Sequence, residues 1–263
     1  MRPLLICLIL AAVAAGEAPV TIAERDPAQA VPQLLRLSRE LAAAPPGRLA
    51  ALAAQADPLA RRILVQGWRV PGRDQVGMAT HTVAAGDTLA RIAKRQGTPY
   101  ELLVRLNPGL DPRRLAVGQR LAVLEARTQP LRLDIHLAQR QLLVWRGSVL
   151  AMACTVGVGA GGTPTPTGST TIAVRAKDPE WRDPVTGKVH PPRSPGNLLG
   201  GFWLGFAPGP DERFRSIGCH GWTGEDERVW VGQAGSRGCI RLATTDLQDL
   251  YDLVPQGAAV TVR

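Results

Sequence analysis

Long hydrophobic stretches, aromatic residues and lysines are all scarce in this 263-residue sequence. After the first fifteen residues, no segment approaches the roughly 20 apolar residues that a transmembrane helix needs. Aromatic residues make up only 4% of the chain, yet 45% of it is hydrophobic, so it can build a sizeable core and a wholly disordered chain is excluded. Frequent glycine (28) and proline (22) favour several small units over one large helical domain.

The charge is strongly basic and comes almost entirely from arginine. Lys and Arg together number 31 against 22 acidic residues, and lysine occurs only at positions 94, 177 and 188. A net charge of +9 is compatible with a polyanionic partner. The arginines are scattered, however, and no nucleic-acid-binding motif interleaves them, so we expect no nucleic-acid partner.

The beginning of the chain predicts export. Residues 1–16 combine Arg2 with an apolar run from Pro3 to Ala15 and small residues at its end, which is typical of a secretory signal peptide. Cys7 lies inside the run and not after it, so a lipid anchor is not expected. We therefore predict an exported protein without a transmembrane segment.

Cysteine is also rare, and its count becomes odd once the signal peptide is removed. Cys154, Cys219 and Cys239 remain in the mature chain. In an oxidising compartment, an odd cysteine either bonds another chain or stays free for chemistry. A protective Cys154–Cys219 disulfide and a reversible Cys219–Cys239 oxidation are the two alternatives, and spacing alone does not choose between them.

Residues 17–75 predict a helical spacer or docking arm with no chemistry of its own. The segment is rich in Ala, Leu and Arg, and its first helical pattern is stopped by the prolines at 45–46. A second helix is expected to begin with Asp57 as its N-cap and Pro58 in its first turn. Gly67 is the expected end of that helix.

Residues 79–125 predict a small β-α-α-β unit. A short strand around His81 is followed by a turn and a helix that ends at Gly97. A capping box over residues 98–101 starts a second helix. A closing strand over 119–124 completes a unit that is plausible as an independent domain.

This unit resembles the LysM family. The motifs that carry the resemblance are, in order, His-Thr-Val at 81, Gly-Asp-Thr-Leu at 86, Ile-Ala at 92, Leu-Asn-Pro-Gly-Leu at 106 and Val-Gly-Gln-Arg-Leu at 117. The resemblance implies binding of glycans that contain N-acetylglucosamine, in a shallow groove between two turns. The residues of these turns are Gly86, Asp87, Thr88 and Leu89 on one side and Asn107, Pro108, Gly109 and Leu110 on the other. We expect the loop backbones to meet the sugar, and the Asp87 and Asn107 side chains to cap helices and turns.

Residues 130–263 predict a mainly-β domain, which makes the whole chain an α+β multidomain protein with a helical N-terminal segment. Apolar residues alternate with polar ones over 131–137, and further strand patterns cover 142–145 and 149–158. A long helical pattern occurs only from Thr244 onward.

One glycine-rich motif in this domain is misleading. Residues 157–162 satisfy G-x-G-x-x-G after a strand, but a dinucleotide site needs a helix next. The prolines in the following Thr-Pro-Thr-Pro-Thr-Gly segment exclude a regular helix. The sequence also contains no G-x-S-x-G elbow and no H-E-x-x-H pair.

The strongest chemical signal lies in two short segments, Cys-His-Gly-Trp at 219–222 and Ser-Arg-Gly-Cys-Ile-Arg at 236–241. A cysteine thiolate is a competent nucleophile, and a nearby imidazole can take and return its proton. Gly238 lets backbone amides near Cys239 point at an oxyanion, while Arg237 and Arg241 should lower the thiol pKa and attract carboxylates.

Two other interpretations use the same residues. Cys239 can be a small buried hydrophobe and His220 a core histidine, which residue identity alone favours. A zinc site built from Cys219, His220 and Cys239 lacks the short spacing of structural zinc ligands. We therefore expect neither a metal nor another cofactor.

The two segments resemble the catalytic domain of YkuD/ErfK-like L,D-transpeptidases. That family has a His-Gly pair, about fifteen residues, and then Ser/Thr-His-Gly-Cys, a hydrophobic residue and Arg or Asn. Here His220-Gly221 precedes the 236–241 segment at that separation, with supporting matches at 165–168 and 197–200. Arg237 stands where many members have a second histidine, which puts the local tuning of pKa values in doubt.

The resemblance assigns a role to each matching residue. Cys239 is the expected nucleophile, His220 the base, and the backbone carbonyl of Gly221 the group that orients the imidazole. The Gly238 and Cys239 amides are the expected oxyanion hole. The residues expected to contact substrate are Ser236, Arg237, Arg241 and Trp222. The segment from Trp181 to Asp211 is a candidate lid over the cleft.

The implied reaction joins peptidoglycan stem peptides. Cys239 attacks the carbonyl of the third residue of a tetrapeptide stem, D-Ala leaves, and an amine from a neighbouring stem resolves the thioester to give a 3→3 cross-link. Water as acceptor makes the protein an L,D-carboxypeptidase, and a lysine of a wall protein makes it an anchoring enzyme. A non-catalytic LysM wall-binding protein is the alternative from another class.

The expected partners are glycan strands and stem peptides in the periplasm or cell wall, with a role in cell-wall biogenesis and cell shape. The sequence does not indicate an oligomeric state.

Overall fold

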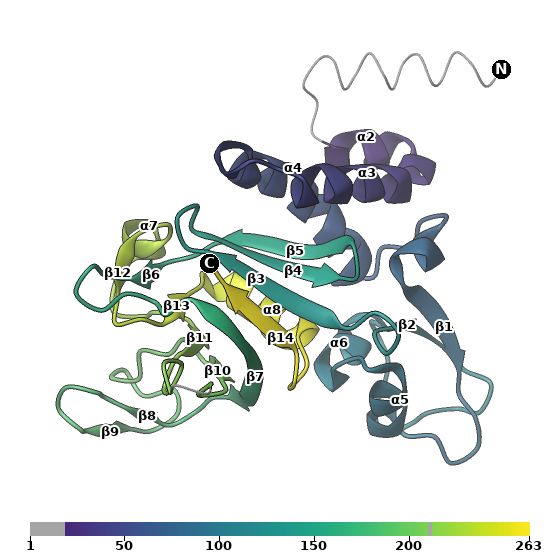
Figure 1. Ribbon diagram of the computed structural model, residues 1–263. Coiled ribbons are helices and arrows are strands. Elements are labelled where there is room, and N and C mark those ends of the chain that lie inside the picture. Colours follow the sequence, from purple (N-terminus) through teal and green to yellow (C-terminus); the bar gives the residue numbers. More distant parts are fainter. Residues whose placement is uncertain (1–18, 210–211) are drawn as a thin grey trace. The chain divides into compact units, whose positions relative to one another are not determined.

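The computed structural model describes residues 19–209 and 212–263, so the predicted signal peptide lies outside the described residues. The chain divides into two compact units (Figure 1). Of the described residues, one unit contains 19–129 together with 146–153, and the other contains 130–145, 154–209 and 212–263. Across these described ranges, no helix has the length and apolar character needed to cross a membrane.

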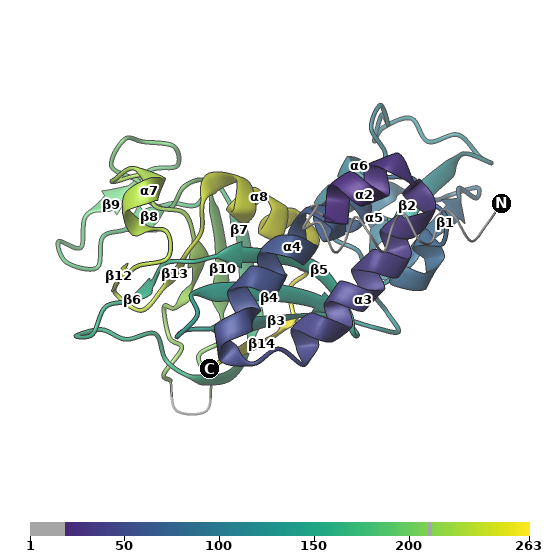
Figure 2. The same ribbon diagram turned by 90° about the horizontal axis from the view of Figure 1, so that it is seen from above.

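The first unit begins with helices that pack against one another (Figure 2). They are α2 (Pro19–Arg25), α3 (Ala30–Ala42) and α4 (Pro46–Leu64), with a 3₁₀ turn at Pro27–Gln29. The apolar stripe of α3 is buried, as its helical spacing predicts. Its buried apolar residues are Ala30, Val31, Leu34, Leu37 and Leu41. The predicted helical N-terminal segment is therefore confirmed.

The second of the expected helices begins twelve residues earlier than the sequence predicted, at Pro46 and not at Pro58. Pro46 is the first residue of α4, and Pro58 lies inside the helix instead of at its start. A proline removes one helical hydrogen bond and usually ends a helix. Here a continuous buried face spans the proline and keeps the helix intact. The residues of that face on both sides of it are Ala53, Ala56, Leu59, Ala60 and Ile63. The helix ends at Leu64, and Gly67 (φ +72°) follows in the next turn.

Asp57 is not an N-cap but part of a polar network within the first unit. Its carboxylate accepts hydrogen bonds from Arg61 Nε (2.8 Å) and from the Ala153 N–H (2.6 Å). Arg61 Nη2 donates to the Ala153 carbonyl at 2.8 Å, and Ser38 Oγ accepts from the Leu150 N–H at 3.0 Å. These side chains satisfy backbone groups that a strand edge otherwise leaves open.

The β-α-α-β unit is confirmed within the first unit. Strands β1 (Met78–Thr82) and β2 (Arg120–Leu124) pair antiparallel, with α5 (Leu89–Gln96) and α6 (Tyr100–Arg105) between them and a 3₁₀ turn at Arg73–Val76 before them. Its small core consists of Val83, Leu89, Ile92, Ala93, Leu103, Leu121 and Val123. Apolar positions on both helices and both strand ends thus meet in one cluster.

Of the two predictions made for the helix ends in this unit, one is confirmed and one is wrong. Gly97 (φ +71°) ends α5, as predicted. The capping box at Thr98 is wrong, because the Thr98 hydroxyl donates to the Leu124 carbonyl and Pro99 is the N-cap without a side-chain bond. The long-range bond to β2 displaces the local one.

The chain from Leu131 onward forms a sheet of eight described strands in the order β13-β11-β10-β7-β14-β3-β4-β5. Their bounds are β3 (Leu131–His136), β4 (Gln141–Arg146), β5 (Val149–Thr155), β7 (Gly168–Lys177), β10 (Phe202–Phe206), β11 (Gly218–His220), β13 (Ile240–Arg241) and β14 (Ala259–Val262). The smaller elements are β6 (Val158–Gly159), β8 (Trp181–Arg182), β9 (Val189–His190), β12 (Ala234–Ser236), α7 (Glu227–Trp230) and α8 (Thr244–Leu253). The predicted mainly-β domain is confirmed.

The C-terminal strand closes the middle of this sheet. β14 pairs parallel with β3 and antiparallel with β7. Helix α8 packs against β10, where the Tyr251 and Phe202 rings lie 4.7 Å apart (Figure 2). This helix and the sheet thus share one apolar core.

The predicted cysteine pairing is not formed in this structure. Cys154 is on β5 and Cys219 is on β11; both are buried, and neither takes part in a disulfide. The protective Cys154–Cys219 disulfide is therefore absent from this structure.

Candidate active site

His220 occupies the end of a three-residue strand in the sheet. On β11 it lies opposite Trp203 of β10 and opposite Arg241 of β13. Because side chains alternate along strands, His220 and Arg241 share one face, while Cys219 and its partner Ile240 share the other. Cys219 and Ile240 are fully buried in the core.

The His220 imidazole is oriented by the next residue. Its Nδ1 is hydrogen-bonded to the backbone carbonyl of Gly221. A carbonyl only accepts hydrogen bonds, so Nδ1 carries the proton and Nε2 keeps its lone pair. This contact is the one that the family resemblance implies for Gly221.

Gly221 is also a point of close backbone approach. The Gly221 N–H donates to the Leu199 carbonyl at 2.9 Å. A Cβ on Gly221 would lie 3.0 Å from Gly200 Cα, and one on Gly200 would lie 2.9 Å from Gly221 Cα. The two glycines therefore allow the 197–200 segment to pack against the histidine strand.

Cys239 lies at the end of a tight loop between β12 and β13. Its Sγ donates to the Ser216 carbonyl at 3.7 Å, and the Gly218 N–H stabilises the sulfur from the same turn. Ser216 has a left-handed backbone (φ +61°), unusual for a residue with a side chain. In the described part of the chain, the thiol thus donates to this carbonyl and not to His220.

The loop before Cys239 is held by Ser236. Its Oγ donates to the Cys239 carbonyl at 2.6 Å and accepts from the Gly238 N–H at 3.1 Å. The Gly238 amide is therefore occupied in this structure, which leaves the Cys239 amide as the candidate oxyanion donor. Ser236 is buried and also lines the cavity, so it supports the loop, and its contact with substrate stays a prediction.

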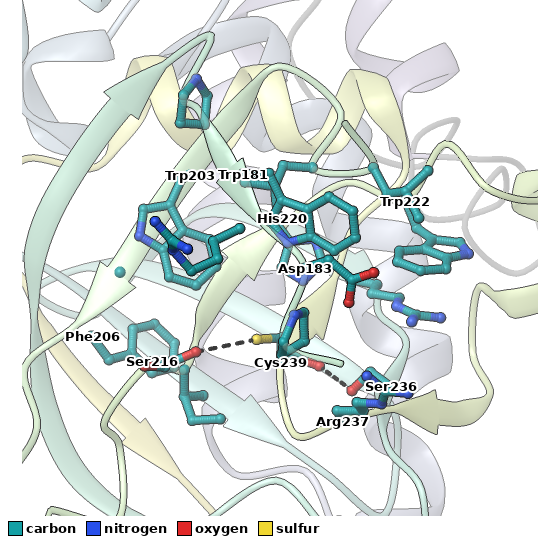
Figure 3. A pocket seen from close by; sticks show the side chains of 18 of the residues that line it. Trp181, Asp183, Trp203, Phe206, Ser216, His220, Trp222, Ser236, Arg237 and Cys239 are labelled. Atoms are coloured by element: carbon teal, nitrogen blue, oxygen red, sulfur yellow. Dashed lines mark hydrogen bonds between the residues drawn. The ribbon is translucent and has the colours of Figure 1, made fainter. Parts of the chain in front are cut away.

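Both reactive side chains open onto one cavity of about 950 Å³. Figure 3 shows Cys239 between Ser216 and Ser236, with His220 above it in this view. Three tryptophans also line the cavity, namely Trp181, Trp203 and Trp222. The arrangement places a thiol and an imidazole at the base of a largely apolar pocket.

Burial controls the ionisation of this pair. It lowers the pKa of His220 to about 4, and the Arg241 charge acts in the same direction. Burial raises the pKa of Cys239, although Gly218 and Arg241 oppose it. Arg241 acts on the thiol pKa in the expected direction, but desolvation outweighs its charge, so the net pKa of Cys239 is raised and not lowered. Near neutral pH the resting pair is a neutral thiol and a neutral imidazole.

The predicted lid divides into parts with different roles. Strands β8 and β9 form a hairpin whose Trp181 and Asp183 line the cavity, and Trp181 stacks on His190. The later part of the segment contains β10, a strand of the main sheet, so it is not a lid. Residues 210–211 lie outside the described residues.

The remaining predicted substrate residues lie around the same cavity. Arg237 is exposed at its edge, and the Arg241 guanidinium lies 3.8 Å from the centre of the Trp222 ring. Sequence reasoning missed Trp203 and Ser216. Trp203 has a weak signal, because Gly205 and Gly218 leave space for its ring, but the φ of Ser216 has none.

The predicted glycan-binding turns carry side chains that serve the module itself. Asp87 accepts from the Ala84 N–H (3.0 Å) and binds His81 and Arg95. Asn107 bonds Leu103 O, Ala122 O and Ala122 N–H. Thr88, not Asp87, caps α5 by accepting from Arg91 N–H. Gly86, Thr88, Pro108 and Gly109 are the exposed residues of these turns.

No group of three or more His, Cys, Asp or Glu side chains within the described ranges is arranged to hold a metal ion. Cys219 points into the core, on the opposite face of the sheet from His220. The three residues of the alternative zinc site therefore do not converge.

Several curated bacterial proteins are similar to this chain. It is 28% identical over 188 residues to the L,D-transpeptidase YkuD of Bacillus licheniformis, covering 70% of this chain and 99% of that protein. Identity to YkuD of Bacillus subtilis is 27% over the same shares. A second Bacillus subtilis protein, YqjB, is 34% identical over 41% of this chain and 57% of its own length.

Solved L,D-transpeptidases are similar over about half of the chain. An Enterococcus faecium enzyme matches with a TM-score of 0.41 and 18% identity, covering 51% of this chain and 49% of that one. A Mycobacterium tuberculosis enzyme matches with a TM-score of 0.41 and 16% identity, covering 56% and 63%. The family model of the L,D-transpeptidase catalytic domain matches residues 130–262, and that of the LysM domain matches residues 81–123. The chain therefore belongs to the L,D-transpeptidase catalytic domain family and carries a LysM domain.

Proposed function

We propose that this protein is an exported cysteine L,D-transpeptidase that cross-links peptidoglycan stem peptides. The observation that carries the proposal is the placement of His220 and Cys239 at one cavity, with the imidazole fixed by the Gly221 carbonyl. A nucleophile, a base and an orienting group are the parts that acyl transfer requires.

The reaction begins with a neutral pair and so needs a proton transfer. Cys239 Sγ attacks the carbonyl of the third stem residue as its proton passes to His220 Nε2. The Cys239 N–H stabilises the oxyanion. The C–N bond then breaks, His220 returns the proton to the departing D-Ala amine, and a thioester remains.

An acceptor completes the reaction on the same residues. His220 removes a proton from an incoming amine, which attacks the thioester and releases the Cys239 thiol. An amine from a neighbouring stem gives a 3→3 cross-link. Water at this step gives an L,D-carboxypeptidase, and a lysine of a wall protein gives an anchoring enzyme.

The LysM domain supports a role at the cell wall. The Gly86–Leu89 and Asn107–Leu110 turns are proposed to bind glycan through backbone amides and carbonyls, because Asp87 and Asn107 are already bonded within the domain. Binding would raise the local concentration of the catalytic domain near stem peptides. Together with the predicted signal peptide at 1–16, this supports a location in the periplasm or cell wall.

Mass spectrometry of purified disaccharide-tetrapeptides incubated with the protein tests the proposal. The expected products are a released D-Ala and a dimer with a 3→3 link. A hydrolysed tripeptide alone identifies a carboxypeptidase, and no change in the substrate identifies a non-catalytic wall-binding protein. A carbapenem is also expected to add its mass to wild-type protein but not to a Cys239→Ala variant.

A further inference from the structure

Arg241 is a cation in the catalytic cavity that lacks an anionic partner. Among the described residues, no carboxylate lies within ion-pair distance of its guanidinium, and its Nε is buried without a hydrogen bond. Glu225 influences it only at longer range. A desolvated, unpaired guanidinium is unfavourable unless a ligand supplies the counter-charge.

The position of Arg241 is fixed from two sides. Its backbone exchanges two hydrogen bonds of 2.9 Å with Gly157, and its guanidinium carbon stacks 3.8 Å from the centre of the Trp222 ring. Stacking occupies one face of the planar group, so its edge donors remain for binding. Such an edge matches a carboxylate in a two-point contact.

The strand register places Arg241 next to His220, the residue that is proposed to protonate the leaving group. His220 and Arg241 are partners on adjacent parallel strands, about 4.8 Å apart along the hydrogen-bonding direction, and they share a face. In the proposed reaction, His220 protonates the amine of the residue that leaves. The α-carboxylate of that residue is only two bonds away from the amine nitrogen.

We propose that Arg241 binds the free α-carboxylate of the leaving residue and so selects stems in which the scissile bond is the last peptide bond. The inference rests on the proposed transpeptidase function and deepens it by naming the group that selects the donor. A stem whose terminal carboxylate is blocked leaves the half-buried guanidinium unpaired. Sites that lose such a partner reject the substrate strongly.

A pair of matched stem peptides tests the inference on the full-length protein. The two are tetrapeptides of the same sequence, one ending in a carboxylate and the other in a carboxamide. We expect wild-type kcat/KM to be about 10- to 100-fold lower for the carboxamide. In Arg241→Gln the kcat/KM values for the two peptides should become nearly equal. Any difference that remains in this variant measures the intrinsic difference between the two leaving groups.

Two further variants separate recognition from folding. Arg241→Lys keeps the charge but loses the planar fork, so its discrimination should lie between those of wild type and Arg241→Gln. Arg228→Gln removes an exposed arginine that is paired with Asp226, and it should discriminate as wild type does. If Arg241→Gln does not fold, the wild-type ratio and the Arg241→Lys ratio still decide the question.

The outcomes distinguish this inference from the proposed function. Equal kcat/KM for both peptides in the wild type, or full discrimination in a folded Arg241→Gln, overturns the role of Arg241. Absence of Cys239-dependent turnover of either peptide overturns the proposed function itself.

Discussion

The LysM domain and the catalytic domain organise their candidate sites in different ways. In the LysM domain, each proposed binding turn is one short stretch of sequence. Thr88 in the first turn caps α5, and Asn107 in the second bonds Ala122 of β2. In the catalytic domain, the cavity collects residues from position 174 to position 241. The residues of each LysM turn are thus adjacent in sequence, whereas strand pairing brings the residues of the catalytic cavity together.

The largest expected effect comes from the nucleophile. Cys239→Ala should lower turnover of tetrapeptide stems by about 10³-fold or more, because it removes the attacking atom at little packing cost. Cys219→Ala, in a buried cysteine on the opposite face, should keep at least part of the activity. Steady-state kinetics together with thermal unfolding measure both effects. Equal loss in two folded variants would contradict Cys239 as the sole nucleophile.

A backbone change tests whether strand packing controls the catalytic site. Gly221→Ala places a Cβ about 3.0 Å from Gly200 Cα, so the carbonyl that orients His220 must shift. We expect kcat to fall roughly 10- to 100-fold and the free energy of unfolding to fall by about 1–3 kcal/mol. Gly161→Ala, with nothing within 4 Å of its Cβ, is the matched control and should change neither. Wild-type kcat in Gly221→Ala would show that the close contact does not matter.

The pH profile tests the burial that only the tertiary structure creates. A base works when unprotonated, and the His220 pKa of about 4 keeps the imidazole neutral down to pH 5. The acid limb of kcat/KM should therefore lie near pH 4–5. At pH 5.5 the activity should be roughly 10-fold higher than an ordinary histidine pKa of about 6.5 allows. An acid limb between pH 6 and 7 would contradict this burial effect.

The smallest expected effect concerns the LysM turns. Gly86 and Gly109 have φ near +80°, so Gly86→Ala and Gly109→Ala strain these turns and redirect their backbone groups. Retention on insoluble peptidoglycan should fall several-fold, while activity on small soluble stem peptides stays unchanged. Gly118→Ala, with a similar φ of +86° in a different turn, is the control. Co-sedimentation with sacculi measures retention. An equal loss of retention in all three variants would contradict a specific role of these two turns in glycan binding.

Predictions from sequence succeeded where a local pattern was decisive. The end of α5 at Gly97 and the period-two strand at Leu131–His136 follow from residue types within a few positions. The expected helix start at Asp57 failed because a buried apolar face carries α4 through Pro58, and Asp57 instead binds Ala153. The capping box at Thr98 failed because its hydroxyl reaches Leu124, which lies far along the chain.

The same division holds inside the candidate site. The sequence by itself singled out Cys239 and His220, with the glycines beside them, as the candidate reactive pair, because a thiol and an imidazole in that pattern resemble the family's motif. Only the tertiary structure decided that Arg241 lies in register with His220 and that Ser216 presents its carbonyl to the thiol. It also decided the protonation states, since desolvation depends on everything packed around a group and not on its neighbours in sequence.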